Sequence, residues 1–219
     1  MDIEELIPEV FPMSSEDGDF DPAWSPDGKS IAFTSLRSEI AHIFAYNFEE
    51  QTLHELSDTQ YPDMQPDWSP DGTQLAVVRK SIYNHIYVIS DKGFTQYQFS
   101  SSGNINDLMP NWSPDGEFMI FSRNSMSPAV PYLVSLNKDD HGNGREQRIP
   151  PFGGTDISPI SGAVLSDDGQ WIVFESWPDG RNHDIYIMDI NGENLARLTT
   201  DPGFEFDPAW RPQFSITSD

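Results

Sequence analysis

The repeated sequence Trp-Ser-Pro-Asp-Gly constrains the fold of this 219-residue chain more than any other feature. Complete copies begin at Trp24, Trp68 and Trp112, a variant copy has Leu165 in place of tryptophan, and Trp210 begins a partial fifth copy. Successive anchor residues of this kind lie 44, 44, 53 and 45 positions apart. A near-constant period of this length indicates one supersecondary unit that is used several times and packs against its neighbours.

Each unit contains the sequence signals of four short strands joined by turns. In the Ser-Pro-Asp-Gly stretch, proline suits the second position of a type I turn, and glycine supplies the positive φ that closes a bulged hairpin. β-Branched and aromatic residues follow in runs that are typical of strands. The second strands are expected around 31–33, 75–77, 119–121 and 172–174, the third around 42–44, 85–87, 130–132 and 184–186, and the fourth around 52–56, 94–99, 145–149 and 195–198.

Four antiparallel strands in a unit of about 44 residues are typical of a β-propeller blade. We therefore predict an all-β fold in which residues 1–219 form a single propeller domain of four-stranded antiparallel blades. Four complete units are expected at about 20–63, 64–107, 108–160 and 161–205, and a partial fifth combines residues 206–212 with an N-terminal strand at 4–13. One sheet cannot cover both of its own faces, so the recurring tryptophan is expected in the core between blades.

The partial fifth unit has an innermost and an outermost strand but lacks the two strands between them. We therefore predict that the chain is a segment of a longer propeller or an open arc of four blades. An open arc leaves strand edges and blade faces uncovered, and such surfaces favour self-association. The alternative is a sealed four-bladed ring, which is the lower limit of the common range.

The repeat resembles that of the TolB-like propellers, whose units read approximately Pro-x-Trp-Ser-Pro-Asp-Gly, then a strand, then Ile-Tyr-Val-Met-Asp-x-x-Gly and Arg-Leu-Thr. The clearest copy here is FESWPDGRNHDIYIMDINGENLARLTTDPGFEFDPAW, and the resemblance extends over residues 10–212. It implies a six-bladed ring of which this chain is a segment. It also implies three settings for such a domain, namely periplasmic scaffold proteins, the gating propellers of prolyl-oligopeptidase-like peptidases, and sensory proteins.

The composition excludes several classes of function. The net charge of −24, from 36 acidic and 12 basic residues, disfavours binding to nucleic acid or anionic membrane surfaces and favours a basic partner or simple solubility. The absence of cysteine excludes disulfides, thiolate zinc sites and cysteine nucleophiles. The N-terminal sequence has no signal-peptide pattern, so we expect a cytoplasmic chain, or a periplasmic one if Met1 is not the native start.

An acidic residue precedes four of the five anchor residues by five positions. These residues are Asp19, Asp63, Asp107 and Glu205, whereas the fourth unit has Ile160. This position lies at the entry to the innermost strand, so the side chains are expected to form an acidic ring at one mouth of the central channel. Such a ring would bind a divalent cation such as Ca²⁺ or a basic ligand. The alternative is that each carboxylate caps its own turn by accepting backbone hydrogen bonds.

The sequence contains no catalytic motif that we recognise. There is no Gly-x-Ser-x-Gly elbow, phosphate-binding loop or dinucleotide fingerprint, and no pair of histidines has metal-binding spacing. We therefore predict a binding or scaffold module that is not an enzyme, has no cofactor and engages a protein partner through one propeller face, where a basic patch on the partner would complement the acidic surface. The alternatives are an accessory domain of a prolyl-oligopeptidase-like peptidase, and a sensor of cations or small ligands that uses the channel mouth.

Overall fold

The computed structural model describes residues 14–100, 103–125, 132–138, 144–149, 159–180 and 182–210. Within these residues it contains four separate antiparallel sheets, each of four strands in sequential order, as the repeat predicts. We call the sheets blades 1 to 4. The strands of blade 1 are β1 (Asp19–Trp24), β2 (Ser30–Ser38), β3 (Ile40–Asn47) and β4 (Thr52–Glu55), and those of blade 2 are β5 (Asp63–Trp68), β6 (Gln74–Lys80), β7 (Asn84–Ser90) and β8 (Thr95–Gln98).

Blades 3 and 4 repeat the same order. Blade 3 consists of β9 (Ile105–Trp112), β10 (Phe118–Ser125), β11 (Tyr132–Lys138) and β12 (Gly144–Arg148), and blade 4 of β13 (Ile160–Leu165), β14 (Trp171–Ser176), β15 (Asp184–Asp189) and β16 (Ala196–Arg197). The expected strand start at Val130 lies outside the described residues. The other expected second and third strands lie inside the observed ones, which extend up to five residues further, and the expected fourth strands agree with those observed to within one residue.

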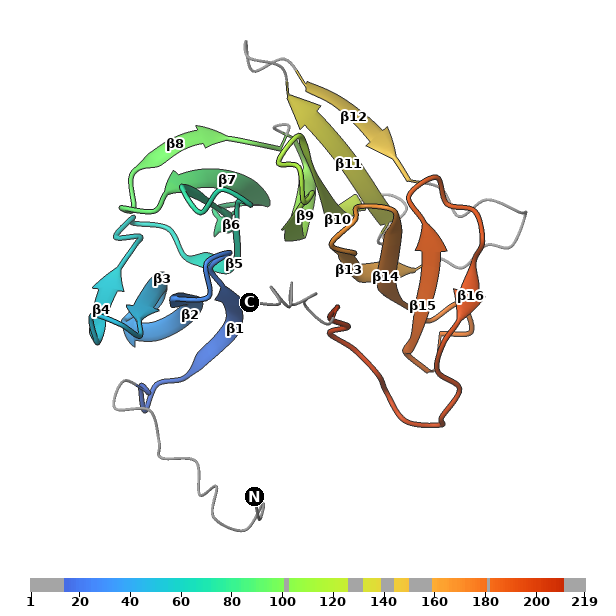
Figure 1. The fold of residues 1–219 in the computed structure, drawn as a ribbon, viewed down its shortest axis with the longest axis horizontal. Coiled ribbons are helices and arrows are strands. Elements are labelled where there is room, and N and C mark those ends of the chain that lie inside the picture. Colours follow the sequence, from blue (N-terminus) through green and yellow to red (C-terminus); the bar gives the residue numbers. More distant parts are fainter. Residues whose placement is uncertain are drawn as a thin grey trace, which may run out of the picture.

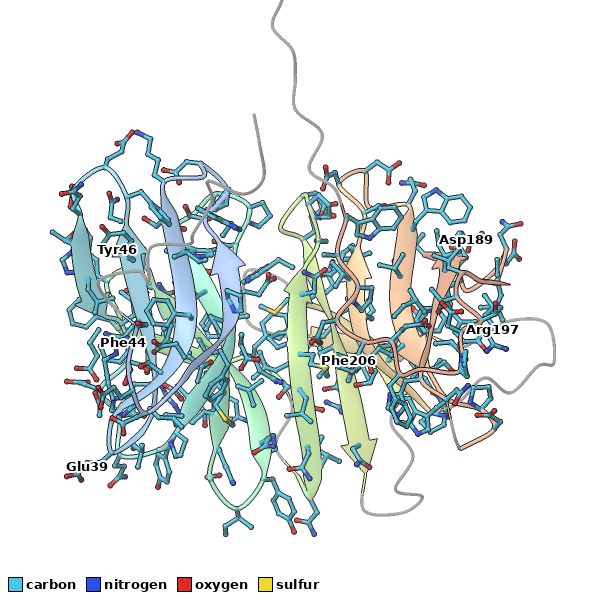
Figure 2. The ribbon with its side chains drawn as sticks, turned by 90° about the horizontal axis from the view of Figure 1, so that it is seen from below. Glu39, Phe44, Tyr46, Asp189, Arg197 and Phe206 are labelled. Carbon is cyan, nitrogen blue, oxygen red and sulfur yellow. The ribbon has the colours of Figure 1, made fainter. Side chains whose placement is uncertain are left out.

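The four blades are arranged as an open arc around a central axis (Figure 1). The first strand of each blade lies nearest the axis and the fourth lies at the outside. Blade 1 and blade 4 border an opening, and Figure 2 looks into that opening from the side, with Phe206 on the segment that follows blade 4. The expectation of an open arc is therefore confirmed over a sealed four-bladed ring.

Ser-Pro-Asp-Gly turns join the first and second strands of blades 1 to 3, and Ser-Asp-Asp-Gly at 166–169 does so in blade 4. The four turns lie together at one end of the arc. Their glycines have φ values of +66° to +74°, which explains the residue type because side chains disfavour this region. A Cβ atom placed on Gly72 would lie 3.8 Å from Cδ of Pro26, and one on Gly116 would lie 3.8 Å from Cδ of Pro70. Each turn is therefore packed against the turn of the preceding blade. We call this end of the molecule the SPDG face.

The innermost strands share a backbone irregularity three residues before the anchor residue. The register of β1 with β2 shifts between Phe20 and Ala23, and similar shifts occur in the other three blades. The residue at this position has positive φ in each case, although it is glycine only in blade 4; the set is Asp21, Gln65, Met109, Gly162 and Asp207. A bulge here bends the strand and increases its twist. The last member, Asp207, follows blade 4 and belongs to no sheet.

The hydrophobic core lies between the blades, as expected for radially stacked sheets. Three clusters of buried residues fill the three spaces between neighbouring blades. Trp68 packs against the cluster between blades 1 and 2, and Trp112 packs against the cluster between blades 2 and 3. Trp24 differs because it is 59% exposed, so the expectation of a buried tryptophan is wrong for the first unit. No described blade precedes blade 1, so none of the described blades covers that face.

The predicted partial fifth unit lies largely outside the described residues. Residues 206–210 are not part of a hydrogen-bonded strand, because the described structure contains no second strand for them to pair with. Residues 211–212 and the proposed strand at 4–13 lie outside the described residues. The described part of the chain also contains no helix that is long and apolar enough to span a membrane.

Candidate functional site

The SPDG face is built from turns that are stabilised by their own side chains. In blade 1, Ser25 Oγ donates to Asp27 Oδ1 at 2.6 Å, and the same oxygen accepts from the backbone N–H of Lys29 at 3.0 Å. The backbone N–H of Ser30 donates to Ser25 Oγ at 2.9 Å. The same bonds recur in the other blades around Ser69, Ser113 and Ser166. The turn is thus rigid without support from another blade.

These bonds keep a row of carboxylates ionised on the SPDG face. The serine hydroxyl and the backbone N–H groups lower the pKa of each turn aspartate below its usual value. All four side chains are exposed; they are Asp27, Asp71, Asp115 and Asp168. Sequence reasoning treated these residues only as turn formers. The structure places them at one end of the arc, where they add a fixed negative charge from each blade.

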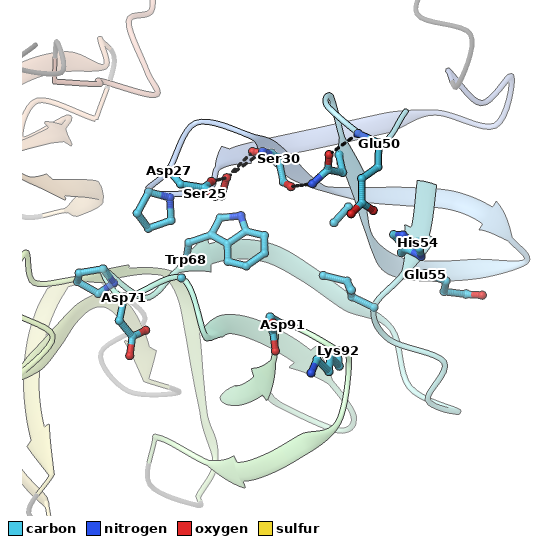
Figure 3. Close-up of a pocket in the computed structure, with 16 residues that line it drawn as sticks. Ser25, Asp27, Ser30, Glu50, His54, Glu55, Trp68, Asp71, Asp91 and Lys92 are labelled. Carbon is cyan, nitrogen blue, oxygen red and sulfur yellow. Dashed lines mark hydrogen bonds between the residues drawn. The ribbon is translucent and has the colours of Figure 1, made fainter. Parts of the chain in front are cut away.

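A groove of about 920 Å³ opens on this face between blades 1 and 2 (Figure 3). The indole of Trp68 forms part of its lining, and Trp68 Nε1 donates to the carbonyl oxygen of Ala23 at 3.3 Å. The charged residues that line it are mostly acidic: Asp27, Glu50, Glu55, Asp71 and Asp91, with Lys92 and His54 as the basic or titratable members. An apolar ring surrounded by carboxylates is suited to a ligand that is both basic and partly apolar.

A second groove occupies the equivalent place between blades 2 and 3. Its volume is about 500 Å³, and its lining includes Trp112, Asp71, Asp115 and Glu117. Asp71 lines both grooves, so the two form neighbouring parts of one acidic surface. The acids Glu50, Asp91 and Glu117 occupy positions that do not recur in the repeat. The periodicity of the sequence therefore does not predict that these acids lie around the tryptophans.

The acidic residues expected at the channel mouth lie at the end of the innermost strands that is opposite the SPDG face. Asp63 is fully buried and accepts two hydrogen bonds from Arg79, at 2.7 and 2.8 Å, from the position directly opposite on β6. Asp107 is fully buried and forms the same paired contact with Arg123, at 2.6 and 2.9 Å. Burial alone would lower the pKa of each guanidinium, but the carboxylates outweigh it and raise that pKa. The negative charges of Asp63 and Asp107 are therefore each balanced by an arginine of the same blade.

The remaining two members of the expected ring have different surroundings. Asp19 accepts from Arg37 at 3.0 Å and from the backbone N–H of Ser15 at 2.6 Å, so it caps its own turn as the alternative interpretation predicts. Glu205 follows blade 4, and its Oε2 atom is buried without a hydrogen-bond partner among the described residues. In the described part of the chain, no three His, Asp or Glu side chains are grouped closely enough to hold a metal ion. Three of the four acids expected in a ring of free like charges thus pair with arginines of their own blades, namely Asp19, Asp63 and Asp107.

The sequence carries a signal for these ion pairs. Arg79 and Arg123 each follow their aspartate by 16 residues, so the acid and the base recur with the same offset. Cross-strand pairing in a hairpin of this length brings the two positions opposite one another.

The fold defines the class of protein: an all-β propeller built from antiparallel four-stranded blades. The chain belongs to the PD40 family, the TolB beta propeller domain, which matches residues 10–141. This confirms the resemblance that the repeat indicates. A search of curated proteins finds no match in sequence.

Solved structures with the same fold include proteins of different kinds. TolB from Acinetobacter baumannii is 25% identical, and the match covers 85% of this chain and 45% of that one with a TM-score of 0.70. A candidate TolB from Agrobacterium tumefaciens is 22% identical, with coverage of 89% and 66% and a TM-score of 0.71. A puromycin-hydrolysing peptidase from Mycobacterium tuberculosis is 16% identical, with coverage of 82% and 29% and a TM-score of 0.57. The chain therefore corresponds to a fragment of larger propellers and spans 45% and 66% of the two TolB structures.

Proposed function

We propose that this chain is a binding module without catalytic activity of its own, and that the SPDG face binds a basic segment of a protein partner. The observation that carries the proposal is the acidic groove around Trp68, where five carboxylates outnumber one lysine. Hydrogen bonds keep two of these carboxylates, on Asp27 and Asp71, ionised well below neutral pH. Complementary charge of this kind increases association rates and selects partners.

The surroundings of the buried histidine support the absence of catalysis. His42 Nδ1 contacts Glu55 Oε1 at 2.7 Å, and Nε2 contacts the carbonyl oxygen of Thr59 at 3.0 Å. Both ring nitrogens are engaged in structural contacts, so this imidazole is not placed to activate a nucleophile. The likeness to a peptidase propeller concerns the fold alone, and the arginine-paired acids do not favour a cation sensor. We expect the isolated chain to hydrolyse no peptide substrate.

A basic peptide probe tests the proposal directly. We expect hexa-arginine to bind the chain and to change its tryptophan fluorescence, with an affinity that falls as salt rises. The double variant Glu50→Gln/Asp91→Asn removes two groove charges and should weaken binding at least fivefold. The matched control Glu193→Gln/Asp201→Asn removes two charges from exposed loops around β16 and should change affinity less than twofold. Equal weakening by both variants would show that only the net charge matters, and the groove assignment would then be wrong.

A further inference from the structure

The groove between blades 2 and 3 has an aromatic wall built from both blades. Tyr97 lies on β8, Phe99 follows that strand, and Trp112 ends β9 of blade 3. The ring centroids of Tyr97 and Phe99 are 6.4 Å apart, and those of Phe99 and Trp112 are 6.0 Å apart. These spacings are those of rings in contact, so the three side chains form one continuous aromatic surface along the groove.

Tyr97 is the exposed member of this wall. Its exposed fraction is 41%, whereas Phe99 is buried beneath it in the core between the two blades. Tyr97 pairs with Val88 on β7, as His54 pairs with Ala45 on β3 in blade 1. The two grooves therefore differ at one equivalent position, where the groove between blades 1 and 2 has a histidine and this one has a tyrosine.

The charges around the aromatic wall have one sign. All three charged residues in the described lining of this groove are acidic, namely Asp71, Asp115 and Glu117, whereas Lys92 takes part in lining the groove between blades 1 and 2. The serine hydroxyls and backbone N–H groups of the turns hold the pKa of Asp71 and of Asp115 below its usual value, so both are ionised at neutral pH. A ligand in this groove meets negative charge and exposed aromatic surface together.

The interior of the molecule shows which cation suits a ring and a carboxylate together. Arg79 binds Asp63 with two hydrogen bonds, and its Cζ atom lies 4.6 Å from the ring centroid of Tyr87. The same combination recurs in two other blades, with Arg37 beside Asp19 and Phe44 in blade 1, and Arg123 beside Asp107 and Phe121 in blade 3. A guanidinium is planar and weakly hydrated, so it can lie on a ring and bind a carboxylate at once, whereas the ammonium of lysine is compact and strongly hydrated.

The groove belongs to the interior of the arc and is independent of its two ends. Blades 2 and 3 each have four strands, and a shared cluster of buried residues joins them. The turn at Gly116 packs against Pro70 of the preceding blade. Further blades would join the arc at blade 1 or at blade 4, and they would leave this groove between the same two blades.

We propose that the groove between blades 2 and 3 is an arginine-selective subsite of the SPDG face, in which an arginine side chain of the partner's basic segment stacks on Tyr97 while the surrounding carboxylates balance its charge. The subsite rests on the proposed function, because it presupposes that a basic segment binds this face, and it names the residue that the segment carries. The carboxylates attract any cation, and the aromatic wall favours a guanidinium over an ammonium.

Two peptides of equal charge separate the subsite from the general attraction. Fluorescein-labelled hexa-arginine and hexa-lysine are titrated with the whole chain, and binding is followed by fluorescence anisotropy. We expect both to bind and hexa-arginine to bind about fivefold more tightly. Equal affinities would overturn the arginine subsite and leave the binding of a basic segment intact. If neither peptide binds, the proposed function and the subsite are both wrong.

Variants of the protein locate the preference at the aromatic wall. Tyr97→Leu removes the exposed ring without a change of charge, so the affinity for hexa-arginine should fall to that for hexa-lysine, while unchanged hexa-lysine binding shows that the variant is folded. Tyr97→Phe keeps the ring and should keep the preference. Tyr61→Leu is the matched control, because Tyr61 is 42% exposed in the loop between β4 and β5, outside the lining of this groove.

The subsite is wrong if Tyr97→Leu retains the preference for arginine, or if it weakens both peptides equally. It is also wrong if Tyr61→Leu reduces the preference as much as Tyr97→Leu does, because any exposed ring would then serve.

Discussion

Blades 1 and 2 present equivalent positions of the repeat to the preceding place in the arc, yet among the described residues only blade 2 has a neighbouring blade there. Trp68 and Leu75 of blade 2 pack against Ala32 and Ile43 of blade 1, and Leu75 and Ile43 are fully buried. On blade 1 the equivalent Trp24 is 59% exposed and stacks on Phe48, at a centroid distance of 5.2 Å. The difference shows that the packed core between blades needs one face from each of two neighbouring units.

The uncovered face of blade 1 has the form that a neighbouring blade would fill. A shallow apolar pocket of about 320 Å³ lies there, and its lining includes Trp24, Ile31, Phe33, Tyr46 and Phe48. The other end of the arc is only partly covered, because residues 204–210 lie against blade 4 without belonging to a sheet. Stability in such an array is close to a sum of unit and interface terms, so the two end blades lack part of the interface energy of the interior ones.

The largest expected effect comes from replacing the equivalent tryptophans of blades 1 and 2 with alanine. We expect Trp68→Ala to lower the free energy of unfolding by about 3–5 kcal/mol, because it removes a large side chain from a packed interface. Trp24→Ala should lower it by less than about 1 kcal/mol, since most of that side chain is already in water. Urea denaturation of both variants measures the difference. Equal losses would mean that the face of blade 1 is covered in solution.

The ion pairs provide a second test, which compares an interior blade with the first. Arg123→Ala leaves the fully buried Asp107 without its partner, and we expect a loss of about 3 kcal/mol. Arg37→Ala affects a pair whose side chains are 20% and 21% exposed, and we expect a loss of about 1 kcal/mol or less. Replacing both members of the interior pair, with Asp107→Leu/Arg123→Leu, should recover part of the loss because no buried charge is left unpaired. A loss from Arg123→Ala no greater than that from Arg37→Ala would contradict the assignment.

Features that depend on one unit alone were predictable from the sequence. The Ser-Pro-Asp-Gly stretch specifies its turn through proline, glycine and the serine–aspartate hydrogen bond, and each of these acts within a few residues. The strands follow from the runs of β-branched and aromatic residues between the turns. Open-arc geometry was also predictable, because it follows from counting the strands that the repeat requires.

Features that depend on two units were not predictable in the same way. The exposure of Trp24 follows from the missing neighbour and not from its own sequence, which matches that around Trp68. Acids precede four of the five anchor residues, as a ring of like charge would require, yet arginines on the adjacent strands pair with Asp63 and Asp107 and balance their charges. The acids of the groove between blades 1 and 2 come from irregular positions on two blades, so periodicity could not reveal them.

A further comparison concerns the residue before the anchor tryptophan, which joins successive blades. Asp67 Oδ2 in blade 2 accepts from the backbone N–H of Trp112 in blade 3 at 2.7 Å. Asn111 Oδ1 in blade 3 accepts in the same way from the backbone N–H of Leu165 in blade 4 at 2.9 Å. The two interfaces thus use the same bond, with a carboxylate in one and a neutral amide in the other. Burial raises the pKa of Asp67 from 3.8 to about 7, although the hydrogen bonds from Trp112 and Asn111 oppose this.

The smallest expected effect follows from this difference and depends on pH. The carboxyl group of Asp67 stays protonated up to about pH 7 in the folded state but loses its proton near pH 3.8 in the unfolded state. The contribution of this group to the free energy of unfolding is therefore greatest below pH 4 and falls as the pH rises to 7. Asp67→Asn keeps the acceptor and removes the charge, so we expect it to raise the free energy of unfolding at pH 8 by about 1–2 kcal/mol, each pKa unit corresponding to about 1.4 kcal/mol before the site relaxes. The converse variant Asn111→Asp should cause a loss at least as large, because it also replaces the amide that donates to Asp67 with a second carboxylate. Urea denaturation from pH 4 to 8 measures both, and parallel pH profiles for the wild type and Asp67→Asn would show that Asp67 is already ionised at low pH.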